Sequence, residues 1–222
     1  MLNAEIVALL NEVTESAYGG YWGMILERLP WSKVATLHEE FKGQPDNENL
    51  DPIAGLINLR AYAAIMTKEA GPEGTALLKR VINDHTYDRH WRALLNIRLG
   101  QTFQPTDRGS AKVHFSVATS AATLAKAYEQ AAVACLLLVA LSINDGDEVQ
   151  NNIRTLKSVL NGIPVTPTTK RYLRHARFML AYTHWYWTNH RLTAAWHFMR
   201  TGRAGRRNEV QQVPPYIAPG WE

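Results

Sequence analysis

The chain has 222 residues, of which 46% are hydrophobic and 20% charged, the balance of an ordinary soluble globular protein. Its single cysteine, Cys135, excludes an intramolecular disulfide and a cysteine-based zinc site. Residues 1–13 lack the basic and apolar regions of a secretory signal, and the longest apolar run, 131–141, is shorter than the roughly 20 residues that span a bilayer. We therefore expect an intracellular, cytoplasmic protein, or a virion component if the chain is viral, with no membrane partner.

The net charge of +4 conceals a strong asymmetry along the chain. Residues 1–148 contain 13 Lys or Arg and 18 Asp or Glu, whereas residues 149–222 contain 11 and 2. Such an imbalance indicates a polyanionic partner, or attraction between neighbouring copies of the chain.

The first half of the chain shows the periodicity of amphipathic helices. Asn3 can cap the first helix, and the string YGGYWG at 18–23 is typical of a turn that holds packed aromatic side chains. Asp51 and Pro52 form a strong pair of start signals for a later helix. The predicted helices of this half are 3–13, 32–41, 51–70, 73–83 and 84–99.

The polar segment 101–110, which contains Pro105 and Gly109, marks the best boundary between lobes. Beyond it, an Ala-rich helix over 116–143 is apolar on every face in its second half, as a central buried helix is. Further helices are predicted at 151–160, 169–188 and 191–201.

The predicted fold class is therefore all-α, a multi-helix globular domain of eight or nine helices that can divide into two lobes. The predicted organisation is an acidic helical lobe over 1–100, a linker over 101–110, a basic helical lobe over 111–207 and an extended, Pro-containing tail over 208–222.

The helix 169–188 carries a basic stripe, because its four cations recur at spacings of three and four residues. Helical steps onward from this stripe reach an aromatic one. Cations that contact phosphates beside aromatic rings that stack on bases are the combination that binds single-stranded nucleic acid. The predicted contacts on this helix are Lys170, Arg171, Arg174, His175, Arg177, Tyr182 and Trp185.

Arg200 and the arginines of the string GRAGRR, which are Arg203, Arg206 and Arg207, extend this predicted surface. Arginines among glycines can follow a phosphate backbone, although a solvated linker has the same composition. The last helix has an apolar stripe that predicts a core face, at Leu192, Ala195, Trp196 and Met199. Trp185 and Trp187 point to different sides, so one of them packs inward.

A different interpretation places the basic stripe against the acidic lobe of the same chain, which would leave nothing for a partner. A helical adaptor that grips an acidic protein surface is the second functional interpretation. The third is a metal-dependent enzyme, because Asp84, His85, Asp88 and His90 are close in sequence. Asp84 and Asp88 also suit ordinary capping and ion-pair roles, so we expect no metal, no cofactor and no catalytic residue.

The tail 211–222 contains apolar anchors, Val213, Tyr216, Ile217 and Trp221, between prolines that favour an extended conformation. We expect it to pack as an arm on a neighbouring subunit, or alternatively on its own core. The leading functional hypothesis is a non-enzymatic, nucleic-acid-binding assembly subunit of the coat or nucleoprotein kind. It would form a homo-oligomer or a multi-subunit complex.

Overall fold

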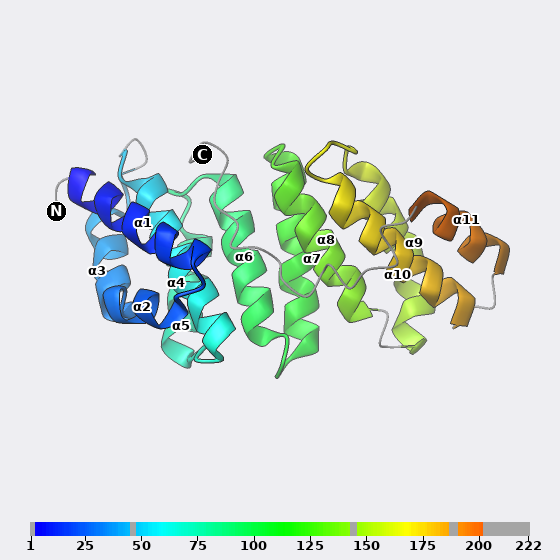
Figure 1. The fold of residues 1–222 in the computed structure, drawn as a ribbon, viewed down its shortest axis with the longest axis horizontal. Helices are drawn as coiled ribbons and strands as arrows, with labels where there is room; N and C mark the ends of the chain where they lie inside the picture. The colour runs from blue at the N-terminus through cyan, green and yellow to red at the C-terminus, as the bar shows by residue number, and fades with distance from the viewer. Residues whose placement is uncertain (1–2, 45–47, 143–145, 187–190, 202–222) are drawn as a thin grey trace. The chain divides into compact units, whose positions relative to one another are not determined.

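The computed structural model describes residues 3–44, 48–142, 146–186 and 191–201, and they form eleven helices and no strand (Figure 1). The predicted all-α, multi-helix fold is confirmed, with more helices than expected. No helix in these described ranges is long and apolar enough to cross a membrane.

The helices fall into two compact units that divide between Thr106 and Asp107. This point lies inside the predicted linker 101–110. That segment is largely helical, however, because one helix continues to Phe103 and the next begins at Arg108. Unit 1 contains α1 (Asn3–Tyr18), α2 (Trp22–Arg28), α3 (Trp31–Phe41), α4 (Leu50–Thr67), α5 (Pro72–Asn83) and α6 (Arg89–Phe103). Unit 2 contains α7 (Arg108–Leu124), α8 (Tyr128–Ser142), α9 (Gly146–Gly162), α10 (Lys170–Tyr186) and α11 (Arg191–Thr201).

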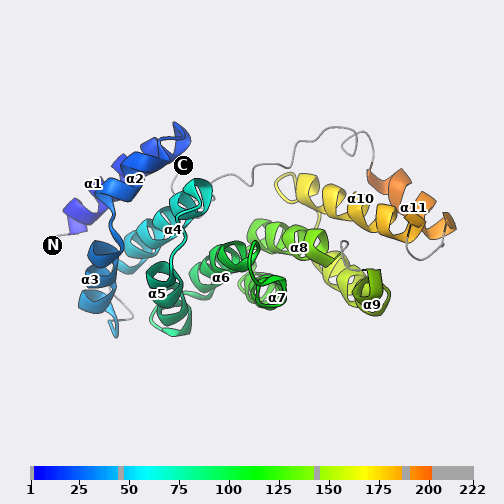
Figure 2. The same cartoon turned by 90° about the horizontal axis from the view of Figure 1, so that it is seen from below.

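Unit 1 is built around α4, whose residues 52–64 are all buried. Helices α1, α2, α3 and α6 pack against it, and α5 packs on α6 (Figure 2). A helix that is buried on every face has no solvent side, so it has to occupy the centre of its unit.

Two arginines are buried in this core, and each lies on an aromatic ring. The guanidinium of Arg98 is 4.4 Å from the ring centroid of Tyr62, and that of Arg60 is 4.4 Å from the ring of Trp31. Arg98 also donates from Nε to Asn58 Oδ1 (2.7 Å) and from Nη1 to Gln101 Oε1 (2.9 Å). Complete burial lowers the pKa of Arg98 to about 10, because a low-dielectric environment disfavours the charged form. The guanidinium thus links α4 to α6 through neutral partners.

Unit 2 is built around α8, in which residues 130–136 are buried. Helices α7, α9 and α10 pack against α8, and α11 folds back on α10 as an antiparallel hairpin (Figures 1 and 2). The predicted central helix over 116–143 is two helices. The chain turns at Lys126, which has a left-handed φ of 59°, with no glycine or proline to signal the break. Ala127 N donates to Ala122 O (2.9 Å), so the end of α7 is satisfied by the backbone.

Besides the division of 116–143 into α7 and α8, the other helix that the sequence did not predict is α2, which follows directly after the Gly19–Gly20 turn. Gly20 has a φ of 73°, and the ring of Tyr21 lies over Gly19 so closely that a Cβ there would be 2.4 Å from Tyr21 Cε2. The YGGYWG string therefore contains the predicted turn, but the turn is shorter than expected and a helix begins at Trp22.

Gly74 in α5 lies against the indole of Trp31, and a Cβ at this position would be 2.4 Å from Trp31 Cζ2. We predict that Gly74→Ala lowers the free energy of unfolding by about 1–3 kcal/mol, because the ring is held by Arg60 and cannot move freely. Gly23→Ala is the matched control, since nothing lies within 4 Å of a Cβ there. That variant should be neutral or gain up to about 1 kcal/mol from helix propensity. Urea denaturation of both variants measures the difference, and equal effects would contradict the packing described here.

Candidate nucleic-acid interface

The start of α10 is fixed by threonines in the connection from α9. Thr166 N donates to Thr169 Oγ1 (2.8 Å), and Thr169 N donates to Thr166 Oγ1 (3.1 Å). This is the reciprocal pattern of a capping box, with Thr169 in the place usually held by Glu or Gln. Lys170 N donates to Thr166 O (2.9 Å), so the helical hydrogen bonding begins at Thr166. The cap sets where the following cations emerge.

The accessible side of α10 carries both cations and aromatic rings. Lys170 and Arg171 are exposed near its start, and Arg174 and His175 are half-buried. Tyr182 and Trp185 are exposed in its last turns. At about 100° per residue, these six side chains fall within less than half of the helix circumference. We call this set the α10 face.

Arg171 has an acidic neighbour from its own unit. Its Nη2 is 3.5 Å from Glu129 Oε1 of α8, and its guanidinium lies 4.5 Å from the ring of Tyr172. The side chain remains exposed, and an exposed ion pair of this kind contributes about 0–1 kcal/mol. Arg171 can therefore exchange this partner for another anion at little cost.

Arg177 does not belong to the α10 face, although the sequence placed it in a continuous basic stripe. Its residue is only 9% exposed, on the side of α10 that packs into unit 2. The sequence pattern could not show this, because Arg177 lies only about 20° from the exposed Lys170 around the helix axis, and its burial depends on what packs beside it two turns further along α10. Its charge acts on Cys135 of α8, but burial dominates and raises the pKa of that thiol to about 12. The thiol is therefore protonated and unreactive at neutral pH.

His175 acts as a neutral ring within the α10 face. Partial burial lowers its pKa below the ordinary value of 6.5. Its ring centroid is 6.3 Å from that of Phe178, so it belongs to the aromatic part of the surface. At neutral pH the positive charge of the face comes from Lys170, Arg171 and Arg174.

The hairpin of α10 and α11 places the last helix opposite to its predicted orientation. Phe198 contacts Phe178 of α10 in an edge-to-face pair with centroids 5.6 Å apart, and Ala194 is buried. The stripe predicted to be core is instead exposed, with Leu192 89% and Met199 71% accessible, and Ala195 and Trp196 also exposed. Spacings of three and four predict that one face of a helix is apolar, but that face is buried only where another element packs against it. Among the described helices, α11 packs on α10.

Arg191, at the start of α11, adds a further cation beside the aromatic end of the α10 face. Its guanidinium is 5.6 Å from the ring centroid of Trp185, which is within the range of a cation–π contact. This neighbour was absent from the predicted set. Arg200 lies in the last turn of α11, but its side chain is not among those described. Arg203, Arg206, Arg207, Trp187 and the tail with Val213, Tyr216, Ile217 and Trp221 lie outside the described residues.

The four residues of the predicted metal cluster do not converge on one point, because Asp84 and His85 each contact a residue outside the cluster. Asp84 accepts hydrogen bonds from the N–H (2.9 Å) and the hydroxyl (2.5 Å) of Thr86, and helix α6 begins only at Arg89. His85 Nδ1 is 2.9 Å from Arg92 Nη1, which places a cation where a metal ion would bind. His90 Nδ1 is 3.9 Å from Asp88 Oδ2. Within the described part of the chain, no group of three or more His, Cys, Asp or Glu side chains could hold a metal ion.

Asp84 instead faces a buried histidine, His38 of α3. His38 Nδ1 is 3.0 Å from the hydroxyl of Tyr87, and its Nε2 is 4.0 Å from Asp84 Oδ2. Burial lowers the pKa of His38, and the nearby carboxylate only partly opposes this. The neutral ring therefore connects α3 to the turn before α6. The burial of His38 could not be inferred from the sequence, because the string HEE at 38–40 is equally typical of an exposed helix face.

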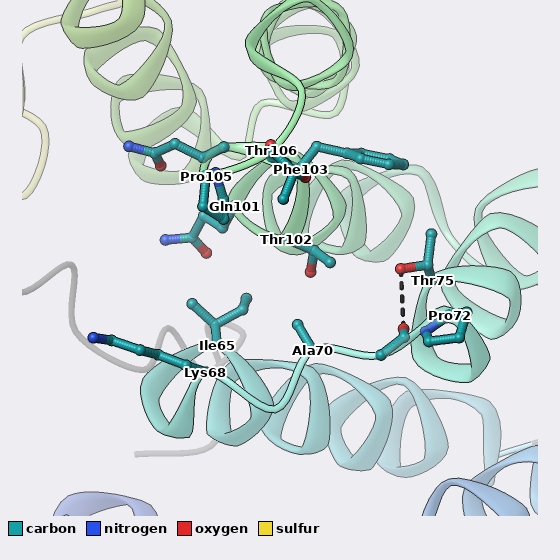
Figure 3. Close-up of a pocket in the computed structure, with 12 residues that line it drawn as sticks. Ile65, Lys68, Ala70, Pro72, Thr75, Gln101, Thr102, Phe103, Pro105 and Thr106 are labelled. Carbon is teal, nitrogen blue, oxygen red and sulfur yellow. Dashed lines mark hydrogen bonds between the residues drawn. The ribbon is translucent and has the colours of Figure 1, made fainter.

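Unit 1 also has a pocket of about 700 Å³ at the C-terminal ends of α4 and α6 (Figure 3). Its apolar lining comes from Ile65, Pro72 and Phe103, and its polar lining from threonines and from Gln101 and Gln104. Lys68 is the one charged residue among those that line it. The lining contains neither a pair of carboxylates nor a nucleophile beside a base, so it offers no acid–base or nucleophilic pair.

No family model, curated protein or solved structure was found to match this chain.

The burial of Arg177 separates it experimentally from its neighbours. We predict that Arg177→Met lowers the free energy of unfolding by at least about 1 kcal/mol, because it removes the interactions of the buried guanidinium and leaves part of its space unfilled. Arg174→Met, one turn earlier and half-buried, should change stability by less than about 0.5 kcal/mol. Urea denaturation tests the pair, and the reverse order would show that Arg177 lies on the open surface.

His38 and His175 make stability depend on pH. Both pKa values are lowered on folding, so the folded state prefers the neutral rings. Stability is therefore complete above the unfolded pKa of about 6.5 and declines as the pH falls below it. The carboxylates with lowered pKa values, such as Asp84, add their own loss only nearer their unfolded pKa.

We predict a lower melting temperature at about pH 5.5 than at about pH 7.5, with a smaller difference in His38→Gln, which cannot be protonated in this range. His85→Gln, at an exposed position, is the control and should retain the full difference. An identical pH dependence in wild type and His38→Gln would contradict the assignment.

Proposed function

We propose that this protein is a non-enzymatic, nucleic-acid-binding assembly subunit in which the α10 face contacts a single strand. The observation that carries this proposal is the composition of the accessible side of α10. It combines Lys170, Arg171 and Arg174 with exposed Tyr182 and Trp185, and α10 itself contains no acidic residue.

The two ends of the α10 face supply the two interactions that a single strand requires. The cations near the start of the helix neutralise phosphates and release their counterions. The rings near its end offer faces for base stacking, which contributes about 1–3 kcal/mol per base and tolerates any sequence. Lys170 and Trp185 are separated by ~22 Å along the helix axis, so one strand can contact both ends.

The charge of the chain supports the same partner. Residues 1–106 contain 10 Lys or Arg against 13 Asp or Glu, and residues 107–222 contain 14 against 7. The division between the units therefore coincides with a change in the sign of the charge. A positive unit attracts a polyanion from a distance and guides it to the cations of α10.

An adaptor that grips an acidic protein is the second candidate, and the contact between Arg171 and Glu129 favours it. This ion pair demonstrates that a carboxylate can occupy the position in which the first candidate places a phosphate. An acidic protein would neutralise the same cations but offers no bases to stack on Tyr182 and Trp185. The two candidates therefore differ in what they require of the aromatic end.

We predict that Lys170→Ala, Arg171→Ala and Arg174→Ala each weaken the binding of fluorescein-labelled oligo(dT) and oligo(rU), whatever the sequence. Each variant should also reduce the slope of log K against log salt by about 0.7, the value for one phosphate contact on a single strand. Fluorescence anisotropy over a salt series measures both quantities.

Two further variants complete this test. Trp185→Ala should weaken binding by about 1–3 kcal/mol while the salt slope stays unchanged, because stacking releases no counterions. Arg89→Ala, which removes an exposed cation of unit 1, is the matched charge control and should leave both quantities unchanged. Wild-type protein with no salt-dependent binding to either oligonucleotide would refute the nucleic-acid function. Binding that is insensitive to Trp185→Ala would favour the adaptor.

A further inference from the structure

Helix α11 presents an apolar face that is not covered by the described part of unit 2. Leu192, Trp196 and Met199 recur at spacings of four and three and are all exposed, the first and last of them strongly. We call these three residues the α11 face. Arg191 is exposed at the same end of α11, about 100° around the helix from Leu192, so a positive charge lies near this surface. Leu and Met side chains have no hydrogen-bond donors for a phosphate, so this surface suits a protein partner better than a nucleic acid.

Unit 1 carries a second exposed apolar patch, at the turn between α1 and α2. Tyr18 is 72% exposed, and Tyr21 and Met24 are also exposed. We call these three residues the turn patch. The ring of Tyr21 folds back over Gly19, so the rings of this turn have a fixed support instead of extending freely into solvent. Tyr18 ends α1, and Tyr21 and Met24 lie at the start of α2, the helix that the sequence did not predict.

The turn patch is bordered by charges of the opposite sign to those near α11. Glu15 lies one turn before Tyr18, Glu27 lies one turn after Met24, and both are exposed. Glu12 is already paired with Arg28 (3.0 Å) across the two helices. The excess charge beside the patch is therefore negative.

We propose that the α11 face of one copy of this chain docks on the turn patch of a second copy. This contact covers apolar side chains that are exposed in the described part of the chain, Leu192 and Met199 on one surface and Tyr18 and Met24 on the other. It also brings Arg191 of one copy near Glu15 and Glu27 of the other. The proposal rests on the assembly part of the proposed function, and it names the surfaces and the partner. The partner is a second copy because this chain itself supplies an apolar patch of complementary charge.

The proposed contact is heterologous, since it joins two different surfaces. Each copy that joins leaves one α11 face and one turn patch free, so the association can continue beyond a dimer. With three apolar side chains on each surface, the contact belongs with small interfaces of less than about 1,200 Å², which are weak. Assembly should therefore appear at high protein concentration, or on a nucleic acid that gathers several copies.

Sedimentation of the full chain over a concentration series up to about 0.5 mM is the first measurement, because weak interfaces require concentrations of this order. The expected result is an average mass that rises continuously with concentration. The rise should be smaller at high salt, which screens the charges that border the two surfaces. Wild-type protein that remains monomeric over the whole series would overturn the proposal.

Two double variants then test which surfaces meet. Leu192→Ser/Met199→Ser removes the apolar part of the α11 face, and Tyr18→Ser/Met24→Ser removes that of the turn patch. Each variant alone should remain monomeric, because every contact needs one intact surface of each kind. An equimolar mixture should form a heterodimer and nothing larger. Each pair has one intact α11 face and one intact turn patch, and the contact between the two copies uses both.

Val113→Ser/Val117→Ser, which alters exposed valines of α7, is the matched control and should assemble like wild type. Circular dichroism confirms that each variant is folded. If only the α11 variant fails to assemble, the contact joins two α11 faces, and the proposal is wrong. It is equally wrong if the mixture remains monomeric, or if either double variant still assembles.

The same variants separate this proposal from nucleic-acid binding. Leu192→Ser/Met199→Ser should retain the affinity for a short oligo(dT) that holds one copy, because the α10 face is unchanged. Conversely, Arg174→Ala should weaken that affinity and leave the self-association of the free protein intact. Wild-type protein that assembles but does not bind oligonucleotides would refute only the nucleic-acid function. Wild-type protein that binds oligonucleotides but stays monomeric would refute only the proposed contact between copies.

Discussion

The buried guanidinium of Arg98 imposes the strictest condition on unit 1. A cation that is removed from water must be compensated, and here the compensation comes from the face of Tyr62 and from two amide oxygens, on Asn58 and Gln101. These groups lie on α4 and α6, so the charge is tolerated only when the two helices are correctly aligned. The remaining helices of the unit pack around this pair, and Arg60 on Trp31 ties α3 to α4 in the same way.

Unit 2 follows a different principle, because its central helix α8 is mostly apolar and Arg177 is the one buried charge among its described residues. Helix α10 packs on α8 and supports α11, while Lys170, Arg171, Tyr182 and Trp185 stay exposed. That division gives α10 its character. The same helix carries a buried arginine and accessible ones, and the difference between them is decided by what packs beside each position and not by residue type.

The two proposed surfaces use different physical forces and therefore need not compete. The α10 face acts through phosphate charge and stacking, which depend strongly on salt. The α11 face acts mainly through apolar contact, to which Arg191 adds direction. A nucleic acid bound along one surface would raise the local concentration of copies and promote contact through the other. The short hairpin of α10 and α11 would then join binding and assembly in one structural element.

The sequence by itself determined the all-α class, most of the helices and the basic character of the second half. These properties follow from local signals, namely periodicity, caps and charge counts, which need no knowledge of neighbours. Only the tertiary structure decided which side of each helix faces solvent. Arg177 became buried and the apolar stripe at Leu192, Trp196 and Met199 became exposed, because burial depends on which helix packs alongside. The break at Lys126 was also hidden, since a left-handed residue that is not glycine leaves no mark in the sequence.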